Sequence, residues 1–383
     1  MLFGELIEPV EVRAQGGDLD TPIGGMTYDS RSVEPGFLFV AVKGFQTDGH
    51  LYIEQAVAGG AVAVVVQEKL VLPAGIAWVL VPDTRLALAQ LSARFYGNPS
   101  ARLKLVGVTG TNGKTTTTHL IAAVCRAAGL KTGLIGTVHN RIGERILPVQ
   151  HTTPESLELQ KLLAEMAEEG VDIAVMEVSS HALELKRVVG CEYDVAVFTN
   201  ITQDHLDFHA DMESYLAAKL KLFAGLAYPG RKTGPKYAVV NADDPAAKTV
   251  ISAAGRQVYT YGVNRPADVR AKNVRITAGG ASFDVDGRWG SYHLALKLTG
   301  LFNVYNALAA FTAGVAAGIP PAVVKEALEK VDGVPGRFEL VNAGQDFAVV
   351  VDYAHTPDGL ENVLKTARRI TGDRLITVFG CGG

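Results

Sequence analysis

The sequence of 383 residues contains only three cysteines, Cys125, Cys191 and Cys381, and they lie far apart. An odd number of widely spaced cysteines does not form a disulfide framework, so we expect buried, reduced thiols. The first residues also lack a basic segment followed by an apolar one, and they include several glutamates, which argues against a secretory signal. Together these absences predict a cytoplasmic protein.

Charge of one sign and long hydrophobic runs are scarce as well. The formal net charge of -4 gives no support to a nucleic-acid-binding surface. The most apolar windows, residues 56–66 and 307–324, are interrupted by Gly, Pro or polar residues and are too short to span a bilayer, so we expect no membrane insertion. With 48% hydrophobic and 20% charged residues, the composition is that of globular domains with sizeable cores, and the length favours two or three of them.

Apolar runs and helical patterns alternate along the chain, which predicts an α/β fold. Residues 1–98 are predicted to form a small α/β domain, and residues 99–336 a larger domain around a mainly parallel sheet, with an antiparallel region between residues 258 and 298. The predicted strands are 37–42, 61–66, 77–81, 173–177, 195–199 and 237–241. The predicted helices are 52–58, 84–96, 156–168, 211–226, 303–317 and 321–330, and a further helix that begins near Lys114 and includes the apolar pattern 119–128.

The last part of the chain predicts a single βαβ unit: a strand at 348–352, a helix at 357–370 and a strand at 375–379, followed by a glycine-rich turn with no helix after it. Such a unit leaves sheet edges unpaired and apolar faces uncovered. We therefore expect the chain to end inside a third domain that begins near residue 337. The alternative is a small appendage packed on the second domain.

The segment Gly110-Thr-Asn-Gly-Lys-Thr-Thr116 lies between a predicted strand and an apolar helical pattern. Its glycines allow backbone N–H groups to approach phosphate oxygens closely, and the following helix offers the positive end of its dipole. Lys114 would add a mobile charge for the β- and γ-phosphates, and the Thr115 hydroxyl would face Mg²⁺. The usual eight-residue spacing would have glycine at Val108, so the loop is a shortened variant. This pattern predicts nucleotide binding.

Polar residues follow two further predicted strands, at the sheet edge where open α/β folds bind ligands. Glu177 ends the first of these strands, and a carboxylate there is a natural Mg²⁺ ligand or water-orienting group. Alternatively the segment caps the next helix, which Ser179 or Ser180 would do equally well. The segment Asn200–His209 contains two His and two Asp and is either a second metal-binding cluster or a solvated loop.

Lys219 falls within the apolar stripe predicted for the helix at 211–226, whereas Lys221 falls on the opposite face. A lysine on an apolar face must extend its ammonium to water, pair with a carboxylate, or lose its charge. A neutral amine also reacts with CO₂ to give a carbamate, an anion able to hold Mg²⁺. From spacing alone, the first of these outcomes is the commonest.

Together these segments resemble the Mur ligases, ATP-dependent enzymes that form amide bonds in peptidoglycan synthesis. The resemblance covers essentially the whole chain. Thr109–Thr116 is similar to the ATP loop of that family, Asn200–Asp207 to its second-metal segment, and Gly300–Ala310 to its adenine-side segment.

Other segments resemble the branch of the family that adds the third amino acid of the peptide. These are Tyr28–Val40, Phe45–Gly49, His151–Pro154 and Glu177–Leu183. Asp211–Lys219 is similar to the segment that bears a carbamylated lysine in the family, which favours N6-carboxylysine at Lys219.

The resemblance implies three domains: an N-terminal UDP-binding α/β domain (1–98), a central P-loop ATPase domain with a parallel sheet (99–336), and the beginning of a Rossmann-like C-terminal domain (337–383). By the same resemblance, ATP would be bound by Gly110, Thr111, Asn112, Gly113, Lys114, Thr115, Thr116, Asn303, Asn306 and Arg337. The UDP-linked substrate would be held by Ser30, Gln46, Thr47, Thr152, Thr153, Ser179 and Arg187. The metal ligands would be Thr115, Glu177, His205 and carbamylated Lys219, and the catalytic residues Lys114, Lys219, His205 and Arg337. A glutamine that contacts substrate in the family is replaced here by Leu185.

The implied reaction adds meso-diaminopimelate or L-lysine to UDP-N-acetylmuramoyl-L-alanyl-D-glutamate, with ATP and Mg²⁺, in cell-wall biogenesis that supports cell shape and division. We expect a monomer that binds this substrate, and an incomplete third domain would leave it unable to finish the ligation. Two alternatives remain. A folylpoly-γ-glutamate-type ligase shares the ATP core but would not need the N-terminal UDP-binding segments, and a nucleotide-binding protein would lack ligase chemistry.

Overall fold

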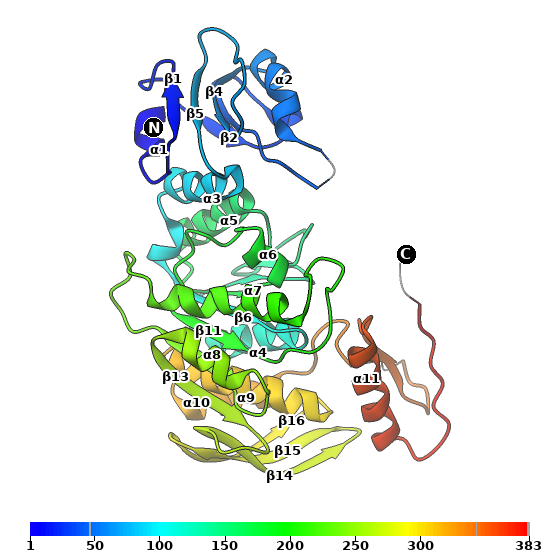
Figure 1. Cartoon of the computed structure of the whole chain (residues 1–383). Coiled ribbons are helices and arrows are strands. Elements are labelled where there is room, and N and C mark those ends of the chain that lie inside the picture. Colours follow the sequence, from blue (N-terminus) through cyan, green and yellow to red (C-terminus); the bar gives the residue numbers. More distant parts are fainter. Residues whose placement is uncertain (46, 342, 381–383) are drawn as a thin grey trace. The chain divides into compact units, whose positions relative to one another are not determined.

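A computed structural model describes residues 1–45, 47–341 and 343–380 of the chain (Figure 1). The chain divides into two compact units. Unit 1 comprises residues 1–102, 154–168 and 182–191, and unit 2 comprises residues 103–153, 169–181 and those from 192 onward. None of the described helices is long and apolar enough to cross a bilayer.

Unit 1 is built on a sheet with the strand order β1-β5-β4-β3-β2, in which β1 alone runs antiparallel to its neighbour. Both faces of this sheet are covered: Val65 of β4 belongs to the core on one face, and Val64 and Val66 belong to the core on the other. Burial on both faces explains why β4 is a continuous apolar run in the sequence. The elements are α1 (Phe3–Ile7), β1 (Ala14–Gly16), β2 (Gly25–Thr27), η1 (Ser30–Ser32), β3 (Phe37–Val40), η2 (Gly49–Tyr52), α2 (Ile53–Ala58), β4 (Ala61–Val66), β5 (Ala77–Leu80), α3 (Thr84–Phe95), η3 (Pro99–Arg102) and α5 (Ser156–Glu168).

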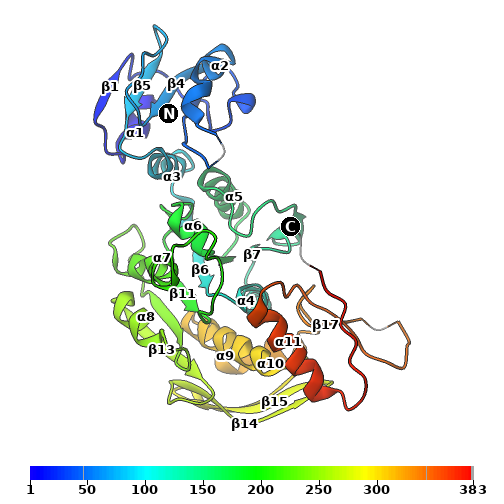
Figure 2. The same cartoon turned by 45° about the vertical axis from the view of Figure 1, so that its right-hand side comes forward.

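Unit 2 is built on a sheet with the order β16-β15-β14-β13-β12-β11-β6-β10-β7-β8-β9. The central strands from β14 to β7 are parallel, and an antiparallel ribbon extends the sheet at each end. Helix α9 packs on this sheet beside α4, and α10 packs against β16; Figure 2 shows α9 and α10 above the β14–β15 ribbon. The elements up to α10 are β6 (Lys104–Thr109), α4 (Lys114–Ala127), β7 (Thr132–Ile135), β8 (Asn140–Ile142), β9 (Arg145–Leu147), β10 (Ile173–Glu177), α6 (Ser180–Glu184), β11 (Val195–Phe198), α7 (Met212–Ala224), η4 (Gly225–Ala227), β12 (Tyr237–Asn241), α8 (Ala247–Ala254), β13 (Gln257–Gly262), β14 (Val269–Thr277), β15 (Gly280–Gly287), β16 (Gly290–Leu296), α9 (Leu301–Ala316) and α10 (Pro321–Lys330).

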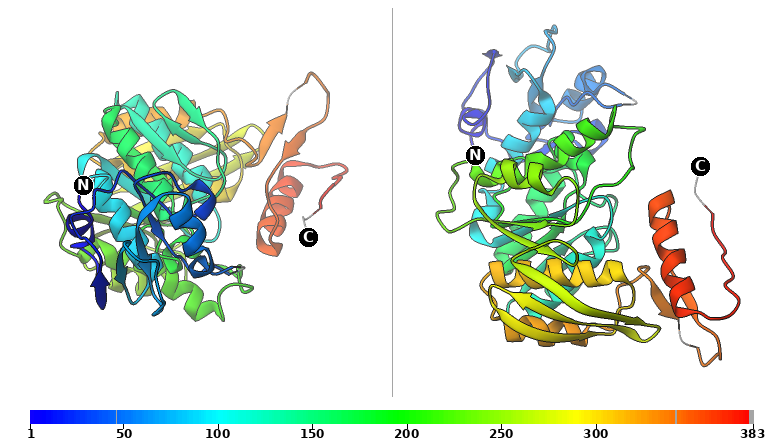
Figure 3. Two further views of the ribbon diagram at one scale, coloured as in Figure 1. Left: turned by 90° about the horizontal axis from the view of Figure 1, so that it is seen from above. Right: turned by 60° about the horizontal axis from the view of Figure 1, so that its bottom comes forward.

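The C-terminal part of unit 2 differs from the predicted βαβ unit. Strands β17 (Glu339–Val341) and β18 (Val349–Val351) pair as an antiparallel hairpin, and α11 (Pro357–Ile370) follows. The strand predicted at 375–379 is wrong, because these residues run as an extended segment without a neighbouring strand among the residues that the structure describes (Figure 3). An apolar run becomes a strand only where another strand offers it backbone partners, and here its side chains Ile376, Val378 and Phe379 are exposed.

Most of the other predicted elements have the expected type, with shifted ends. The predicted helix at 52–58 is shorter and is preceded by the η2 turn, because the Asp48 side chain accepts a hydrogen bond from the His50 N–H. The helix predicted to begin near Lys114 is confirmed, since α4 starts at that residue directly after the phosphate loop and ends at Ala127. Cys125 is buried as expected, Cys191 is only partly buried, and Cys381 lies outside the described residues.

The parallel order of the central strands brings their carboxyl ends to one edge of the sheet. Strand β6 lies between β10 and β11, and each of the three leads into one of the polar segments noted in the sequence. Ligands of open α/β sheets bind at this edge. The fold therefore places the phosphate loop, Glu177 and the segment after residue 199 next to one another.

Candidate active site

The loop between β6 and α4 requires glycine at two positions. Gly110 has φ +151° and Gly113 has φ +85°, backbone conformations that side chains rarely adopt. A Cβ atom on Gly110 would lie 1.9 Å from the Thr199 hydroxyl oxygen, and one on Gly113 would lie 2.4 Å from the Asn306 Oδ1 atom. The loop is thus packed against the end of β11 and against α9, in addition to any ligand it holds.

The residues after β11 hold this loop in place. The Asn112 N–H donates to Asn200 Oδ1 at 2.9 Å, and the Asn200 Nδ2 group donates to the Asn112 carbonyl at 3.1 Å. Thr199 donates to the same carbonyl at 2.6 Å, and Thr111 accepts from the Thr202 N–H at 3.0 Å. The loop therefore has a fixed shape, and its backbone need not be reorganised when a phosphate binds.

Lys114 and Lys219 converge on one backbone acceptor. Their Nζ atoms donate to the carbonyl oxygen of Gly110 at 3.0 and 2.9 Å, and Lys219 is only 1% exposed. Burial and the nearby charge of Lys114 hold the pKa of Lys219 well below its usual value, against the opposing influence of Asp204. Burial also lowers the pKa of Lys114, which Glu177 and Asp204 oppose. From spacing alone, the commonest outcome was an ammonium that extends to water. The structure differs, because the Lys219 side chain is buried and its Nζ atom donates to a backbone carbonyl.

The position of Lys219 follows from the start of its helix. Asp211 caps α7: its Oδ1 atom accepts from the Ser214 N–H at 2.7 Å, and the Ser214 hydroxyl accepts from the Asp211 N–H at 3.1 Å. This cap fixes which face of α7 turns inward. Lys219 and Tyr215 are on the buried face, with the Lys219 Nζ atom 4.3 Å from the centre of the Tyr215 ring, while Lys221 is exposed as predicted.

Glu177 forms a buried polar cluster with two threonines. Its Oε2 atom accepts from the hydroxyls of Thr115 at 3.0 Å and Thr137 at 3.1 Å, and its Oε1 atom accepts from the Thr137 N–H at 2.8 Å. Arg337 donates to the Thr115 hydroxyl oxygen at 2.9 Å, and its guanidinium carbon lies 5.0 Å from the centre of the Tyr353 ring. Thr115 of the phosphate loop thus contacts both the Glu177 carboxylate, a candidate metal ligand, and Arg337, which is distant in the sequence.

These oxygens suit a hard cation. Thr115 Oγ1 and Glu177 Oε2 are neighbouring oxygen atoms of the kind that Mg²⁺ prefers, and they lie at the start of the phosphate-loop helix. Among the residues that the structure describes, no three His, Cys, Asp or Glu side chains are grouped to hold a metal ion. Mg²⁺ usually takes one or two protein oxygens and completes its shell with phosphate oxygens and water, so this donor set fits it.

His205 lies in the loop after β11 with a left-handed backbone, φ +54°. Burial lowers its pKa, although Asp204, whose Oδ2 atom is 3.4 Å from His205 Nε2, opposes this effect. A neutral imidazole is the form that binds metals. The His205 ring lies 6.0 Å from the Tyr215 ring and 4.7 Å from that of His181, so it is in the same neighbourhood as Lys219.

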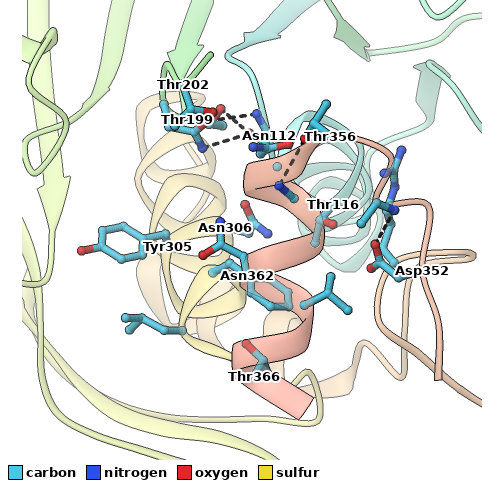
Figure 4. A pocket seen from close by; sticks show the side chains of 18 of the residues that line it. Asn112, Thr116, Thr199, Thr202, Tyr305, Asn306, Asp352, Thr356, Asn362 and Thr366 are labelled. Atoms are coloured by element: carbon cyan, nitrogen blue, oxygen red, sulfur yellow. Dashed lines mark hydrogen bonds between the residues drawn. The ribbon is translucent and has the colours of Figure 1, made fainter. Parts of the chain in front are cut away.

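A cavity of about 520 Å³ lies beside the phosphate loop within unit 2. It is lined by the loop, by α9, and by α11 with the segment before it; Figure 4 shows Asn306 and Tyr305 on α9 and Asn362 and Thr366 on α11. Its size suits a nucleotide-sized ligand. Of the two asparagines predicted to face adenine, only Asn306 lines the cavity. Asn303 lies behind it, where its Oδ1 atom accepts from Asn306 Nδ2 at 3.1 Å.

Three residues of this site were not found from the sequence. Thr137 binds both oxygens of Glu177, Tyr353 stacks on Arg337, and Tyr305 lines the cavity with its hydroxyl donating to Asp243 Oδ2 at 2.7 Å. Thr137 and Tyr305 have no local pattern that sets them apart. Tyr353 lies in the segment Asp352–Pro357, whose polar residues after a strand were the only available signal.

The predicted substrate residues of unit 2 lie next to Glu177. Thr153 donates to the Glu177 carbonyl at 2.8 Å and accepts from the Ser179 N–H at 3.1 Å. The Thr152 hydroxyl is 3.1 Å from that of Thr137. These three side chains are therefore brought together at the carboxyl end of β10.

The predicted substrate residues of unit 1 fall in two places. Ser30 donates to Gln55 Oε1 at 3.0 Å, and Thr47 is 3.1 Å from the hydroxyl of Tyr52, so both contact the start of α2 and the residue before it. Arg187 instead pairs with Glu155 Oε1 at 2.6 Å. The other predicted residue, Gln46, lies outside the described residues.

Comparisons with known proteins agree with this arrangement. The Mur ligase middle domain matches residues 108–314, the Mur ligase family catalytic domain residues 22–96, and the Mur ligase glutamate ligase domain residues 336–383. The chain belongs to the Mur ligase family. Its fold is the three-domain α/β architecture of the Mur ligases, as the sequence predicted, and the three family models match three successive parts of the chain.

Individual relatives show which Mur ligases this chain resembles. The chain is 49% identical to the UDP-N-acetylmuramoyl-L-alanyl-D-glutamate–2,6-diaminopimelate ligase of Syntrophomonas wolfei, over 100% of this chain and 78% of the relative. A solved structure of a ligase with the same name matches with a TM-score of 0.83 and 34% identity, over 100% of this chain and 77% of that one. The matches cover the whole of this Mur ligase chain and 78% and 77% of the two relatives, and the expectation of an incomplete third domain stays a prediction.

A more distant likeness concerns the fold alone. A Mycobacterium tuberculosis folylpolyglutamate synthase complexed with ADP and AMPPCP matches with a TM-score of 0.62 at 22% identity, over 73% of this chain and 70% of that one. The folate-ligase alternative thus reflects a shared architecture.

Proposed function

We propose that this Mur ligase adds 2,6-diaminopimelate to UDP-N-acetylmuramoyl-L-alanyl-D-glutamate with hydrolysis of ATP to ADP. The observation that carries the proposal is the convergence of Lys114, Lys219 and the Thr115–Glu177 pair around the phosphate loop, in a chain 49% identical to a ligase of that name. The relatives' names favour 2,6-diaminopimelate over L-lysine. We also propose that the protein acts as a cytoplasmic monomer in peptidoglycan synthesis.

ATP would lie along the loop and the neighbouring cavity. The backbone from Gly110 to Thr116 would surround the phosphates, and Lys114 would exchange its bonds to loop carbonyls for bonds to phosphate oxygens. Asn306 would face the adenine, with Asn303 orienting it. Arg337 already reaches Thr115, so its guanidinium would contact the phosphates from the opposite side.

Two metal positions are proposed. Thr115 and Glu177 would hold one Mg²⁺, and His205 with a modified Lys219 would hold the other; Mg²⁺ supplies charge neutralisation to the phosphates and the carboxylate. As an ammonium, Lys219 would repel a cation. Its lowered pKa leaves the neutral amine available to attack the carbon of CO₂, which forms an N–C bond and releases one proton. The resulting carbamate is an anionic ligand in a buried position.

The chemical steps need little from the protein beyond placement. The γ-carboxylate of the D-glutamyl residue attacks the γ-phosphorus of ATP in line, and ADP leaves. The amine of the incoming amino acid then attacks the acyl phosphate and displaces phosphate through a tetrahedral intermediate. Lys114 and Arg337 neutralise the charge that moves between these groups.

The UDP-linked substrate would be held at both ends. Ser30, Gln46 and Thr47 would contact the uridine end, and Thr152, Thr153, Ser179 and Arg187 the muramoyl-peptide end. Thr152, Thr153 and Ser179 support this assignment because they lie beside Glu177, where the attacking carboxylate must meet the γ-phosphate.

The experiment that tests the proposal is an ADP-release assay with ATP, Mg²⁺, the UDP-linked dipeptide and 2,6-diaminopimelate. We expect ADP release to require the dipeptide substrate, and folate substrates to give none. ADP release that is indifferent to the UDP-linked dipeptide would contradict the proposal, as would release that a folate substrate supports instead.

A further inference from the structure

Arg85 of unit 1 is a partly buried cation with little to neutralise it. It is the second residue of α3, its side chain is 23% exposed, and its closest carboxylate atom is Glu155 Oε2 at 3.9 Å. Its guanidinium makes no hydrogen bond to any of the residues that the structure describes. Five N–H donors of a mostly buried arginine are therefore left for water or a ligand.

Three other cations of unit 1 are paired more closely with carboxylates than Arg85 is. Lys43 lies 3.0 Å from Glu68 and Arg31 lies 2.7 Å from Asp29, while Lys186 forms an ion pair with Asp83. Arg187 binds Glu155 at 2.6 Å, whereas Arg85 lies 3.9 Å from it. The ion pair of Arg85 with Glu155 is therefore the weaker of the two. Among the residues that the structure describes, Arg85 therefore has one carboxylate within 4 Å, and that carboxylate lies closer to Arg187.

The neighbours of Arg85 place it between the two groups of proposed substrate residues in unit 1. Its guanidinium carbon lies 5.8 Å from the centre of the Phe45 ring, in the loop that also carries Thr47. On its other side is Glu155, which leads to Arg187. The order of contacts is thus Phe45, Arg85, Glu155 and Arg187.

The substrate has the same order of parts. Between its uridine and its muramoyl peptide lies a diphosphate, which carries two negative charges. The residues proposed for the uridine end are uncharged, and Arg187 is already neutralised by Glu155. A diphosphate needs cationic donors, and the planar guanidinium of an arginine matches phosphate oxygens with two parallel N–H groups.

We propose that Arg85 binds the diphosphate of the UDP-linked substrate. This inference rests on the proposed function, because it takes the uridine and muramoyl ends from it. Glu155 lies between the two arginines and contacts each with a different oxygen, so that Arg85 and Arg187 would meet different parts of the substrate.

The test is calorimetric titration of the whole chain and its Arg85→Ala variant with UDP, and competition by uridine, which has no phosphate. Loss of one charge-assisted contact predicts that Arg85→Ala binds UDP about 10- to 100-fold more weakly, with uridine unaffected. Arg187→Ala should bind UDP as the wild type does and lose affinity only for the UDP-linked dipeptide. Arg85→Lys keeps the charge but loses the paired N–H donors of the guanidinium, so its affinity for UDP should fall between those of the wild type and Arg85→Ala.

Arg94→Ala is the matched control, because Arg94 lies on the same helix and pairs with Glu8 at 2.5 Å. It should leave UDP binding unchanged, and Arg85→Gln provides a second neutral variant if Arg85→Ala folds poorly. Wild-type affinity for UDP in both neutral variants would overturn the role of Arg85 and show a structural ion pair with Glu155. Failure of the wild-type chain to bind UDP or the UDP-linked dipeptide would instead overturn the proposed function.

Discussion

At the scale of single residues, the central feature is a pair of lysines that share one acceptor. Lys114 and Lys219 both donate to the Gly110 carbonyl, in a buried site where two ammonium groups repel each other. Burial, and after it the charge of Lys114, lowers the pKa of Lys219, and a neutral amine is what carbamylation requires. Burial lowers the pKa of Lys114 as well, against the opposing charges of Glu177 and Asp204, so the roles of Lys114 toward phosphate and of Lys219 in modification remain part of the proposed function.

Replacement of Lys219 by alanine should remove most of the ligase activity, by at least about 100-fold, because an anionic metal ligand is lost. A short carboxylic acid such as formate should restore part of it by occupying the vacated position. Lys221→Ala is the control on the same helix: Lys221 is exposed, so activity and stability should change little. Steady-state kinetics with and without formate give the comparison. Full activity of Lys219→Ala, or no rescue, would contradict the carbamate role.

His119, one helical turn after Thr115, should make stability depend on pH. Burial lowers its pKa from 6.5 to about 4, and its Nδ1 atom lies 2.8 Å from the Thr115 carbonyl oxygen. The folded state therefore binds the proton less readily than the unfolded state. The resulting contribution is fully present above pH 6.5 and is lost as the pH falls through about 4, by up to about 3 kcal/mol.

Urea unfolding of wild type and His119→Gln between pH 7 and pH 4 measures this effect. The free energy of unfolding of the wild type should fall more steeply than that of His119→Gln over this range. Parallel curves for the two proteins would show that His119 is not held neutral.

At the scale of elements, the phosphate loop depends on two glycines with positive φ, Gly110 and Gly113. Gly113→Ala would place a methyl group against Asn306, and Gly110→Ala would place one against Thr199. Both variants should lose ATP binding by about 10-fold or more, because the loop must shift to relieve the overlap. Gly129→Ala is a matched control: Gly129 has φ +79° but nothing within 4 Å of its added Cβ. It should cost about 1 kcal/mol of stability and leave ATP affinity intact.

Calorimetric titration with a non-hydrolysable ATP analogue measures these affinities. If Gly110→Ala and Gly113→Ala bind the analogue as Gly129→Ala does, the packing of the loop against β11 and α9 is not what holds its shape.

Elements with a strong local pattern could be predicted from the sequence, and those that depend on distant partners could not. The apolar stripe of α7 and the run before Glu177 each carry their own signal, so Lys219 and Glu177 were placed correctly. The apolar run 375–379 carries a similar signal, but no strand within the described part of the chain pairs with it. The contacts of Arg337 with Thr115 and of Arg85 with Glu155 join residues far apart in the chain, and no spacing rule reveals them.

At the scale of the whole molecule, the residues proposed to bind ATP and those proposed to bind the uridine end belong to different units. Unit 2 contains the phosphate loop, the candidate metal ligands and the cavity, and unit 1 contains the uncharged residues proposed for uridine together with Arg85 and Arg187. The folylpolyglutamate synthase shares the architecture at low identity, so the fold alone does not choose between the two chemistries. The two activities differ in the carboxylate substrate and in the amino acid that is joined to it, so these substrates must be tested directly.

The most direct measurement is the mass of the product formed from UDP-N-acetylmuramoyl-L-alanyl-D-glutamate, ATP and Mg²⁺ in an equal mixture of 2,6-diaminopimelate and L-lysine. The account predicts one product, the UDP-linked tripeptide that carries 2,6-diaminopimelate, formed with one ADP for each amide bond. A lysine-containing product, or ATP consumption without any tripeptide, would contradict it.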